Sequence, residues 1–251
     1  MSENFLDTLK DGKGYVLSAL NKKDLNTFRK IIEKSWINTI SKKYPNYKKI
    51  FLNEKIFNYH KNSHKISHAE IWSKKSRTLS AKDVSEIKKI TFFKDLQKKF
   101  SKLKLSDEEK IGHGIIVYRI VRPNIRKDIG PLHSDKWFWD IDKKDLRRNY
   151  DIPKGYKKIR IWFSLYANKN YGFKLVPYSQ NKDYKFKKIY KDGRYKPIFN
   201  AKDYNLRPLT IDSTPGNIVI FNDNLIHGGK INKSNKTRVS AELTLFLKEY
   251  K

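Results

Sequence analysis

Two stretches of strict alternation between apolar and polar residues constrain the fold of this chain most. In 158–166, Ile159, Ile161, Phe163 and Leu165 alternate with Arg160, Trp162, Ser164 and Tyr166. In 238–247, Val239, Ala241, Leu243, Leu245 and Leu247 alternate with Arg238, Ser240, Glu242, Thr244 and Phe246. Because successive side chains on a strand point to opposite faces, each stretch predicts a strand of an antiparallel sheet with one apolar and one more polar face.

Shorter segments extend this pattern through the second half of the chain. Residues 115–121, 216–221 and 225–229 also read as strands, separated by turn residues such as Asn222–Asn224. Short strands of this kind fit a double-sheet jelly roll. In such a fold we expect the apolar faces to point outward onto other elements and the polar faces to line a pocket.

The first part of the chain is helical by periodicity. Apolar residues recur at three- and four-residue steps from Leu25 to Ile40, and a second stripe runs from Val84 to Phe100 after a cap at Ser80. We therefore expect a mainly β fold with added α-helices, as a single domain over 1–251. Residues 1–110 would form a helical buttress, and residues 111–251 the jelly-roll core.

The chain is strongly basic, with 56 Lys and Arg against 26 Asp and Glu and a net charge of +30. The excess is mainly Lys, is scattered along the chain and accompanies abundant Asn, Ile, Tyr and Phe, which is typical of an AT-rich coding sequence. An electrostatic preference for an anionic substrate or surface stays open. Dedicated nucleic-acid binding is disfavoured because no zinc-finger, RNP or basic-zipper pattern accompanies the charge.

Cysteine is absent, which excludes disulfides, thiolate metal sites and cysteine nucleophiles. The sequence contains no run of eighteen apolar residues, so we expect no transmembrane helix. The N-terminus lacks the pattern of a secretory signal. We expect a cytoplasmic protein without a membrane partner. The sequence does not indicate its oligomeric state.

Three residues form a candidate metal site. His133 and Asp135 stand two apart in GPLHSDKWFW, and His227 follows 94 residues later in FNDNLIHGG. On an extended strand the first two would project to the same side. Two His and one carboxylate on one face of an ion leave positions open, as in the facial triad of iron(II) oxygenases. Taken separately, a His-x-Asp pair is more often a surface pair, and a lone His after Leu225 and Ile226 is more often a packed core histidine.

Arg238 adds weight to the metal site. It comes eleven residues after His227, on the polar face of the last strand, which it shares with Ser240. A buried Arg needs an anionic partner, and a guanidinium suits a carboxylate held by two parallel hydrogen bonds. The far carboxylate of 2-oxoglutarate would fit, with the Ser hydroxyl as a third donor. The alternative is a structural salt bridge to Glu242.

A second histidine group carries less information. His60, His64 and His68 are spaced four apart, as on one face of a helix. No carboxylate completes a metal site with them, so we interpret them as solvated or partly packed side chains.

In the order and spacing of these motifs, residues 112–247 resemble the phytanoyl-CoA dioxygenase family of 2-oxoglutarate oxygenases. GPLHSDKWFW resembles the segment with the first two ligands, and TPGNIVIFNDNLIHGGKINKSNKTRVSAELTLF resembles the closing segment. The resemblance implies a double-stranded β-helix, with His133, Asp135 and His227 as iron ligands. It also implies that Arg238 anchors the co-substrate and that Trp162 borders it. Iron(II), 2-oxoglutarate and O2 are the implied cofactors.

The implied activity is hydroxylation of a small-molecule substrate, with succinate and CO2 as co-products. The sequence departs from the family at VPYSQ (176–180) and at Gly229, where a Ser is frequent, and Ser240 would take that role. Asp135 argues against a halogenase, and Thr244 replaces the second Arg of related nucleic-acid demethylases. Trp137, Phe138 and Trp139 could wall the pocket, and we take Tyr118, Trp137 and Trp139 as candidate substrate contacts. The alternatives are an inactive metal-binding jelly roll and a basic nucleic-acid-binding module.

Overall fold

The computed structural model describes residues 5–142, 152–191 and 194–249. Its α-helices are α1 (Phe5–Lys10), α2 (Lys22–Lys43), α3 (Lys48–Glu54), α4 (His68–Trp72), α5 (Lys74–Arg77), α6 (Ala81–Lys88), α7 (Thr91–Lys99) and α8 (Asp135–Asp142). Short 3-10 helices are η1 (Pro45–Tyr47), η2 (Ile56–Lys61), η3 (Ser63–Lys65), η4 (Arg126–Asp128), η5 (Ser179–Asn181) and η6 (Ala201–Tyr204). The strands are β1 (Tyr15–Ala19), β2 (Lys102–Leu105), β3 (Ile116–Val121), β4 (Lys157–Tyr166), β5 (Phe173–Leu175), β6 (Lys187–Lys191), β7 (Arg194–Ile198), β8 (Leu209–Ile211), β9 (Asn217–Phe221), β10 (His227–Gly229) and β11 (Arg238–Lys248).

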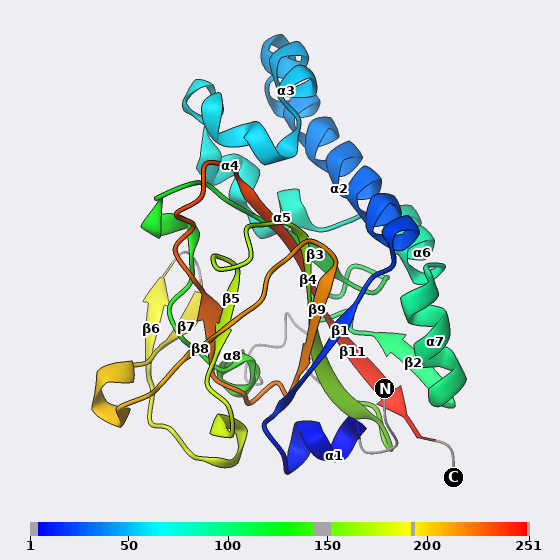
Figure 1. Cartoon of the computed structure of the whole chain (residues 1–251), viewed down its shortest axis with the longest axis vertical. Coiled ribbons are helices and arrows are strands. Elements are labelled where there is room, and N and C mark those ends of the chain that lie inside the picture. Colours follow the sequence, from blue (N-terminus) through cyan, green and yellow to red (C-terminus); the bar gives the residue numbers. More distant parts are fainter. Residues whose placement is uncertain (1–4, 143–151, 192–193, 250–251) are drawn as a thin grey trace.

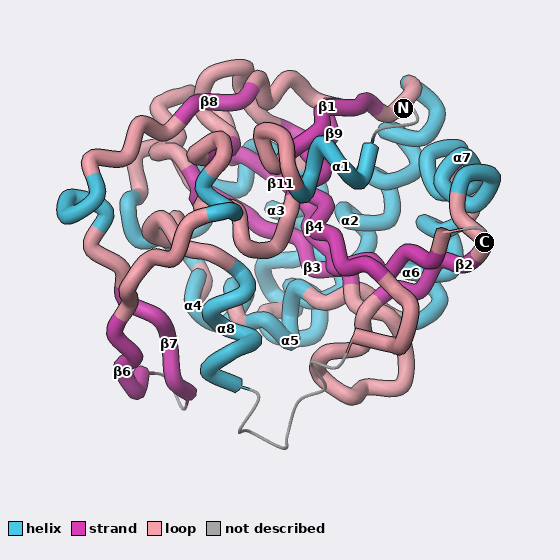
Figure 2. Tube along the Cα trace, turned by 90° about the horizontal axis from the view of Figure 1, so that it is seen from below, coloured by secondary structure: helices cyan, strands magenta, loops and turns pink. Residues whose placement is uncertain are grey.

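These strands form two antiparallel sheets and a separate ribbon. The large sheet has the order β1-β9-β4-β11, and β3 and β2 pair with the other edge of β11. The small sheet has the order β10-β5-β8, and a bridge between His133 and His227 adds the segment around His133 to its edge. Strands β6 and β7 pair only with each other and lie beside α8, away from the large sheet (Figure 2). The prediction of a jelly roll with added helices is confirmed.

Helices cover the outer face of the large sheet, where α2, α6 and α7 lie along one side (Figure 1). The apolar members of both alternating stretches are buried in one cluster with Phe28, Ile32 and Trp36 of α2. Phe163 of β4 lies at the centre of this layer, since its ring contacts those of Phe28, Phe92 and Phe93. The predicted outward apolar face is therefore the surface on which the helices pack.

The space between the two sheets is divided into an apolar and a polar part. A cluster that includes Trp162, Phe173, Leu175 and Phe221 fills one part. The other part is lined by charged and hydroxyl side chains of β3, β4 and β11. This second part forms a pocket, so the predicted polar lining is found there, whereas Trp162 of the same predicted face packs in the apolar cluster.

The first 110 residues are less uniformly helical than predicted. Strand β1 pairs with β9 and strand β2 with β11, so this segment also supplies strands of the large sheet. The stripe from Val84 to Phe100 is divided into α6 and α7, because Ile90 is extended. The N-terminus of α7 is capped from another helix: the Asp24 carboxylate of α2 accepts hydrogen bonds from the Thr91 hydroxyl and the Phe92 amide, both at 3.3 Å. The predicted cap at Ser80 is confirmed.

None of the helices described combines the length and the hydropathy that a membrane span requires.

Candidate active site

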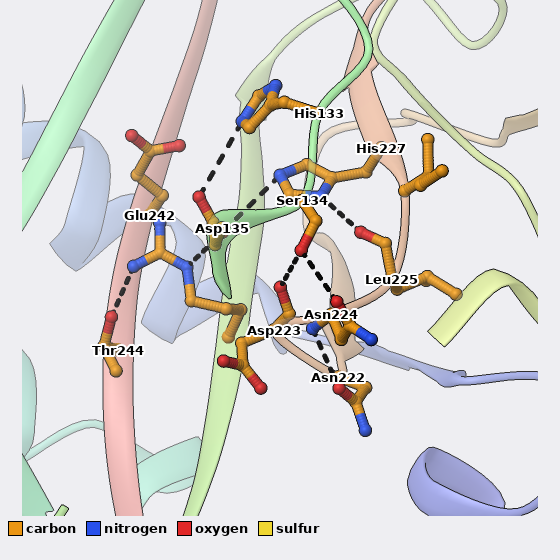
Figure 3. Close-up of polar contacts among 12 residues, drawn as sticks. His133, Ser134, Asp135, Asn222, Asp223, Asn224, Leu225, His227, Glu242 and Thr244 are labelled. Atoms are coloured by element: carbon orange, nitrogen blue, oxygen red, sulfur yellow. Dashed lines mark hydrogen bonds and ion pairs between the residues drawn. The ribbon is translucent and has the colours of Figure 1, made fainter. Parts of the chain in front are cut away.

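A backbone bridge brings two of the predicted ligands together. His133 and His227 each donate an amide hydrogen bond of 2.9 Å to the carbonyl of the other. The Ser134 hydroxyl donates to the Asp223 carbonyl at 3.1 Å and to the Asn224 side chain at 3.2 Å, as Figure 3 shows. These bonds fix the segment that carries His133 to the turn before β10, so two segments far apart in sequence form one side of the site.

Asp135 reaches the same point by a different route from the one predicted. It is the first residue of helix α8, so His133 and Asp135 do not lie on one extended strand. The side chains still converge (Figure 3): an Asp135 oxygen is 3.7 Å from His133 Nε2, and the other is 3.5 Å from His227 Nε2. One ligand atom from each residue lies within 4.8 Å of the other two, which confirms the predicted cluster of three.

Both imidazoles present Nε2 to this point. His133 Nδ1 lies 2.8 Å from the Pro131 carbonyl, and His227 Nδ1 lies 2.9 Å from the Leu225 carbonyl. A carbonyl only accepts hydrogen bonds, so Nδ1 of each ring carries the proton and the Nε2 lone pair is left for a metal. Burial lowers the pKa of His227 to about 4, so this ring is neutral at pH 7.

Arg160 of β4 is the cation nearest to this carboxylate. Its Nε is 2.7 Å from Asp135 Oδ2, although the N–H is not aimed along the hydrogen-bond direction, so the contact is an ion pair. Its Nη1 donates to the Thr244 hydroxyl of β11. Burial opposes ionisation of Asp135, but Arg160 and the two imidazoles outweigh it and hold the pKa of this carboxyl well below its usual range.

Arg238 is buried without a carboxylate partner among the described residues. Its Nη1 donates to the carbonyls of Tyr171, Gly172 and Lys230 at 2.6, 2.7 and 2.9 Å, and its Nε has no hydrogen-bond partner. The alternative of a salt bridge to Glu242 is wrong, since Glu242 pairs with Arg119 at 2.8 Å. Burial, and to a smaller extent Arg119, lowers the pKa of Arg238 to about 10.

The departure from the family pattern at Gly229 has a steric reason. A Cβ at this position would lie 3.2 Å from Arg238 Nη2 and 3.3 Å from a methyl group of Ile129. Glycine therefore leaves room for the guanidinium. Ser240, on the same face of β11, is buried, in keeping with its predicted place beside Arg238.

A cavity of about 280 Å³ adjoins the three ligands on the side of His133 and Asp135. The acidic residues that line it each pair with a basic neighbour: Glu242 with Arg119, Asp135 with Arg160, and Glu108 with Lys74 at 2.8 Å. Arg119 holds Glu242 ionised against the effect of burial and lowers the pKa of that carboxyl to about 2. Arg77 lines the cavity as well, so four Lys and Arg side chains accompany three carboxylates in its wall, an excess far smaller than that of the chain as a whole.

The aromatic residues after the ligands divide between two surfaces of α8. Phe138 and Trp139 line the cavity, three and four residues after Asp135 and hence on the same helical face. Trp137 does not line it, because its ring stacks on Phe186 at 5.0 Å on the opposite side of the helix. Of the aromatic residues expected to wall the pocket, Trp137 therefore lies outside the lining of this cavity.

Two further candidates lie outside the cavity lining. Tyr118 is fully buried in the layer between the helices and the large sheet. Its neighbours Val117 and Arg119 line the cavity instead, as alternation along a strand requires, so the candidate role of Tyr118 in substrate contact is wrong. Trp162 stacks on Phe173 at 5.2 Å, and Phe173 in turn stacks on His227 at 5.4 Å, so Trp162 is one ring removed from a ligand.

The histidines at 60, 64 and 68 do not share a helix, because they fall in η2, η3 and α4. His64 is exposed, whereas His60 hydrogen-bonds Thr237 at 3.0 Å and His68 lies 3.3 Å from Asp128. The interpretation of these side chains as solvated or packed agrees with this arrangement.

Sequence reasoning did not identify how Arg160 and Arg119 are used. Both pair with acidic residues of the cavity wall. For Arg160 the signal was present in the sequence: it belongs to the polar face of an alternating stretch, where a buried Arg needs an anion.

The residues present fit a divalent metal that prefers nitrogen and oxygen ligands. Two Nε2 atoms with free lone pairs and one ionised carboxylate meet within 4.8 Å, and Asp135 Oδ1 lies 3.7 Å from His133 Nε2 while Oδ2 is paired with Arg160. Three protein ligands on one face are the donor set of non-haem iron(II) oxygenases, in which the remaining positions stay open.

Comparison with solved structures agrees with the fold. EvdO2 from Micromonospora carbonacea var. aurantiaca has 10% identity and a TM-score of 0.54, over 100% of this chain and 93% of that one. EctD from S. alaskensis, solved with bound Fe, has 12% identity and a TM-score of 0.50, over 98% and 76%. A comparison with curated protein sequences gives no match. The model of the family described as Phytanoyl-CoA dioxygenase (PhyH) matches residues 25–240. The expected cofactors, iron(II), 2-oxoglutarate and O2, are those of this family, and the chain belongs to the phytanoyl-CoA dioxygenase family of oxidoreductases.

Proposed function

We propose that this dioxygenase hydroxylates a small polar molecule and converts 2-oxoglutarate to succinate and CO2 in the same reaction. One observation carries the proposal. The three ligands lie between the two sheets together with Arg238, a buried guanidinium without an anionic partner among the described residues. A metal that chelates one end of a dicarboxylate and a guanidinium that takes the other end would account for both features.

Each residue has a separate task in this proposal. His133, Asp135 and His227 hold iron(II), which when bound supplies the redox chemistry and open positions at which 2-oxoglutarate and O2 meet. Arg238 binds the far carboxylate of the co-substrate, with Ser240 as an additional donor. Trp162 and Phe173 close the apolar side of that space and exclude water.

The substrate would occupy the cavity beside His133 and Asp135, where Phe138 and Trp139 form an aromatic wall. Its volume of about 280 Å³ lies just below the range of roughly 300–1,000 Å³ typical of ligand pockets, which favours a small substrate. Since the acidic residues in the wall are already paired, a cationic substrate would lack a compensating partner. With Arg77 also in the wall, these features disfavour a cationic substrate and favour a small polar molecule that is neutral or anionic.

Anaerobic titration of the metal-free protein with iron(II) and 2-oxoglutarate tests the proposal. The chelate gives a weak metal-to-ligand charge-transfer band in the visible range. We expect the band in the wild type, its loss in His133→Ala and its weakening in Arg238→Ala. His64→Ala is the matched control, because His64 is exposed and outside the cluster. A folded wild-type protein that takes up neither iron nor 2-oxoglutarate would contradict the proposal.

A second measurement addresses turnover. Release of succinate from 2-oxoglutarate in air should depend on added iron(II) and rise when a panel of small polar molecules includes a substrate. A binding protein with an inactive metal site would give the absorption band but no succinate, which separates the two functions.

A further inference from the structure

We infer that Arg160 is a positioning residue: it holds the Asp135 carboxylate so that the metal is bound through Oδ1 alone. The inference rests on the proposed function, since it concerns the same metal site. The inference assigns a role to Arg160, which contacts the proposed metal ligand Asp135 but does not itself bind the metal.

The geometry places Arg160 on one side of the carboxylate. Its Nε lies 2.7 Å from Oδ2, which also lies 3.5 Å from His227 Nε2, whereas Oδ1 faces His133 Nε2 at 3.7 Å. The contact with Arg160, and not the distance to the imidazoles, therefore distinguishes the two oxygens. Both side chains are largely buried, with 12% of Arg160 and 14% of Asp135 exposed. In so enclosed a place the charge of the guanidinium is weakly screened.

The charge of Arg160 makes the two carboxylate oxygens unequal toward a metal. A cation bound at Oδ2 would come close to the guanidinium and be repelled by it, whereas a cation at Oδ1 has the carboxylate between itself and Arg160. Binding through both oxygens would in addition fill one of the positions that the co-substrate and O2 need. Arg160 therefore both neutralises Asp135 and keeps a coordination position open.

The anchoring of Arg160 explains why an arginine is suited to this place. While Nε faces Asp135, Nη1 donates to Thr244 on the neighbouring strand β11. A planar guanidinium can make both contacts in a fixed geometry, whereas a lysine ammonium is a single point on a flexible stem. Lysine would keep the charge and lose the orientation.

The test uses Arg160→Lys with Mn(II) as the metal probe. The observable is the number of water molecules on the bound Mn(II), measured by electron-nuclear double resonance in H2¹⁷O. With three protein ligand atoms on a six-coordinate ion, about three waters are expected in the wild type. If Asp135 becomes bidentate in the variant, the count falls to about two and Mn(II) affinity decreases about 10- to 100-fold, as for other losses of an orienting partner.

Arg122→Lys is the matched control, because Arg122 is also paired with a buried carboxylate, that of Asp128, at 2.9 Å, but is not part of the cluster. It should keep the wild-type water count even if the protein is less stable. Thr244→Val removes only the anchor and should lower the count in the same direction. It decides the question if Arg160→Lys does not fold.

A count that stays at the wild-type value in Arg160→Lys and in Thr244→Val overturns the inference, whatever the change in affinity. A count that falls in the matched control as well also overturns it, because the effect would then be one of general stability. A wild-type protein that does not bind Mn(II) is a different result, which counts against the proposed function itself.

Discussion

Asp128 is the residue whose replacement should cost most stability outside the apolar core. Its carboxylate accepts hydrogen bonds from the amide, Nε and Nη2 of Arg122, all at 2.9 Å, and lies 3.3 Å from His68 Nε2. His68 in turn contacts the hydroxyl of Tyr59 at 2.9 Å. The Asp128 carboxylate in η4 thus connects two other parts of the chain: Arg122, which directly follows β3, and His68, which begins α4.

Asp128→Asn keeps the volume of the side chain and removes its charge. Breaking a buried ion pair by removing one partner costs about 3–5 kcal/mol. Arg122 is 20% exposed and can recover some hydration, and asparagine keeps one acceptor, so we expect the lower end, about 3 kcal/mol. For a chain of this length that corresponds to a decrease in Tm of roughly 6–12 °C.

The pH dependence of this difference follows from the direction of the pKa shift. Burial opposes ionisation of Asp128, but hydrogen bonds from Arg122 and His68 outweigh it, so its pKa lies well below the usual range. A depressed pKa stabilises the folded state above the unfolded value of about 3.9, and this contribution is lost as the pH falls from there toward the folded pKa. The difference between wild type and variant should be constant from about pH 8 to 5 and shrink below about pH 4.

Urea denaturation followed by circular dichroism across this pH range measures the effect. Asp140→Asn is the control, because Asp140 pairs with Lys136 on the exposed side of α8 and should change stability by less than about 0.5 kcal/mol. The reasoning is refuted if Asp128→Asn costs less than about 1 kcal/mol at pH 7. It is also refuted if the difference does not decrease in acid.

Three further predictions concern the core and the site. Phe163→Ala removes the ring between the helices and the large sheet and should cost about 3–5 kcal/mol by denaturation; a loss below about 1 kcal/mol would contradict the packing described. Gly229→Ala crowds Arg238 Nη2 and should raise the KM for 2-oxoglutarate about tenfold with a Tm within roughly 2 °C of wild type; an unchanged KM would place the co-substrate elsewhere. Removal of iron(II) from a solution at a hundred times its Kd should lower stability by about 2.7 kcal/mol in a thermal melt, and His227→Ala should show no such response.

The large sheet could be predicted from the sequence because its signal is local. Alternation along β4 and β11 depends only on which residues face the helices, and the structure buries the predicted apolar face. The ligand cluster was predictable for a related reason: its residues stand in short motifs, and the bridge between His133 and His227 joins those motifs directly.

Features that depend on distant partners could not be predicted in this way. The break before α7 is set by Asp24, which caps a helix 67 residues later in the chain. Similarly, Trp137 was misplaced because the change from extended chain to helix at Asp135 turns its ring away from the cavity. The alternation along β3 could be predicted from the sequence, but not which of its two faces, and hence whether Tyr118, is turned to the helices.

The pairing of acidic with basic side chains around the cavity separates two electrostatic properties of this protein. At physiological salt the field of an exposed charge is screened over about 8 Å, so the surface lysines act on a molecule mainly as it approaches. Inside, Glu242 and Arg119, and likewise Asp135 and Arg160, act as dipoles, whose field depends on orientation and falls off faster than that of a charge. Ionic strength should therefore change the rate at which a substrate associates with the protein. The selectivity for one substrate over another should depend on how the dipole of the substrate aligns with these fixed ion pairs.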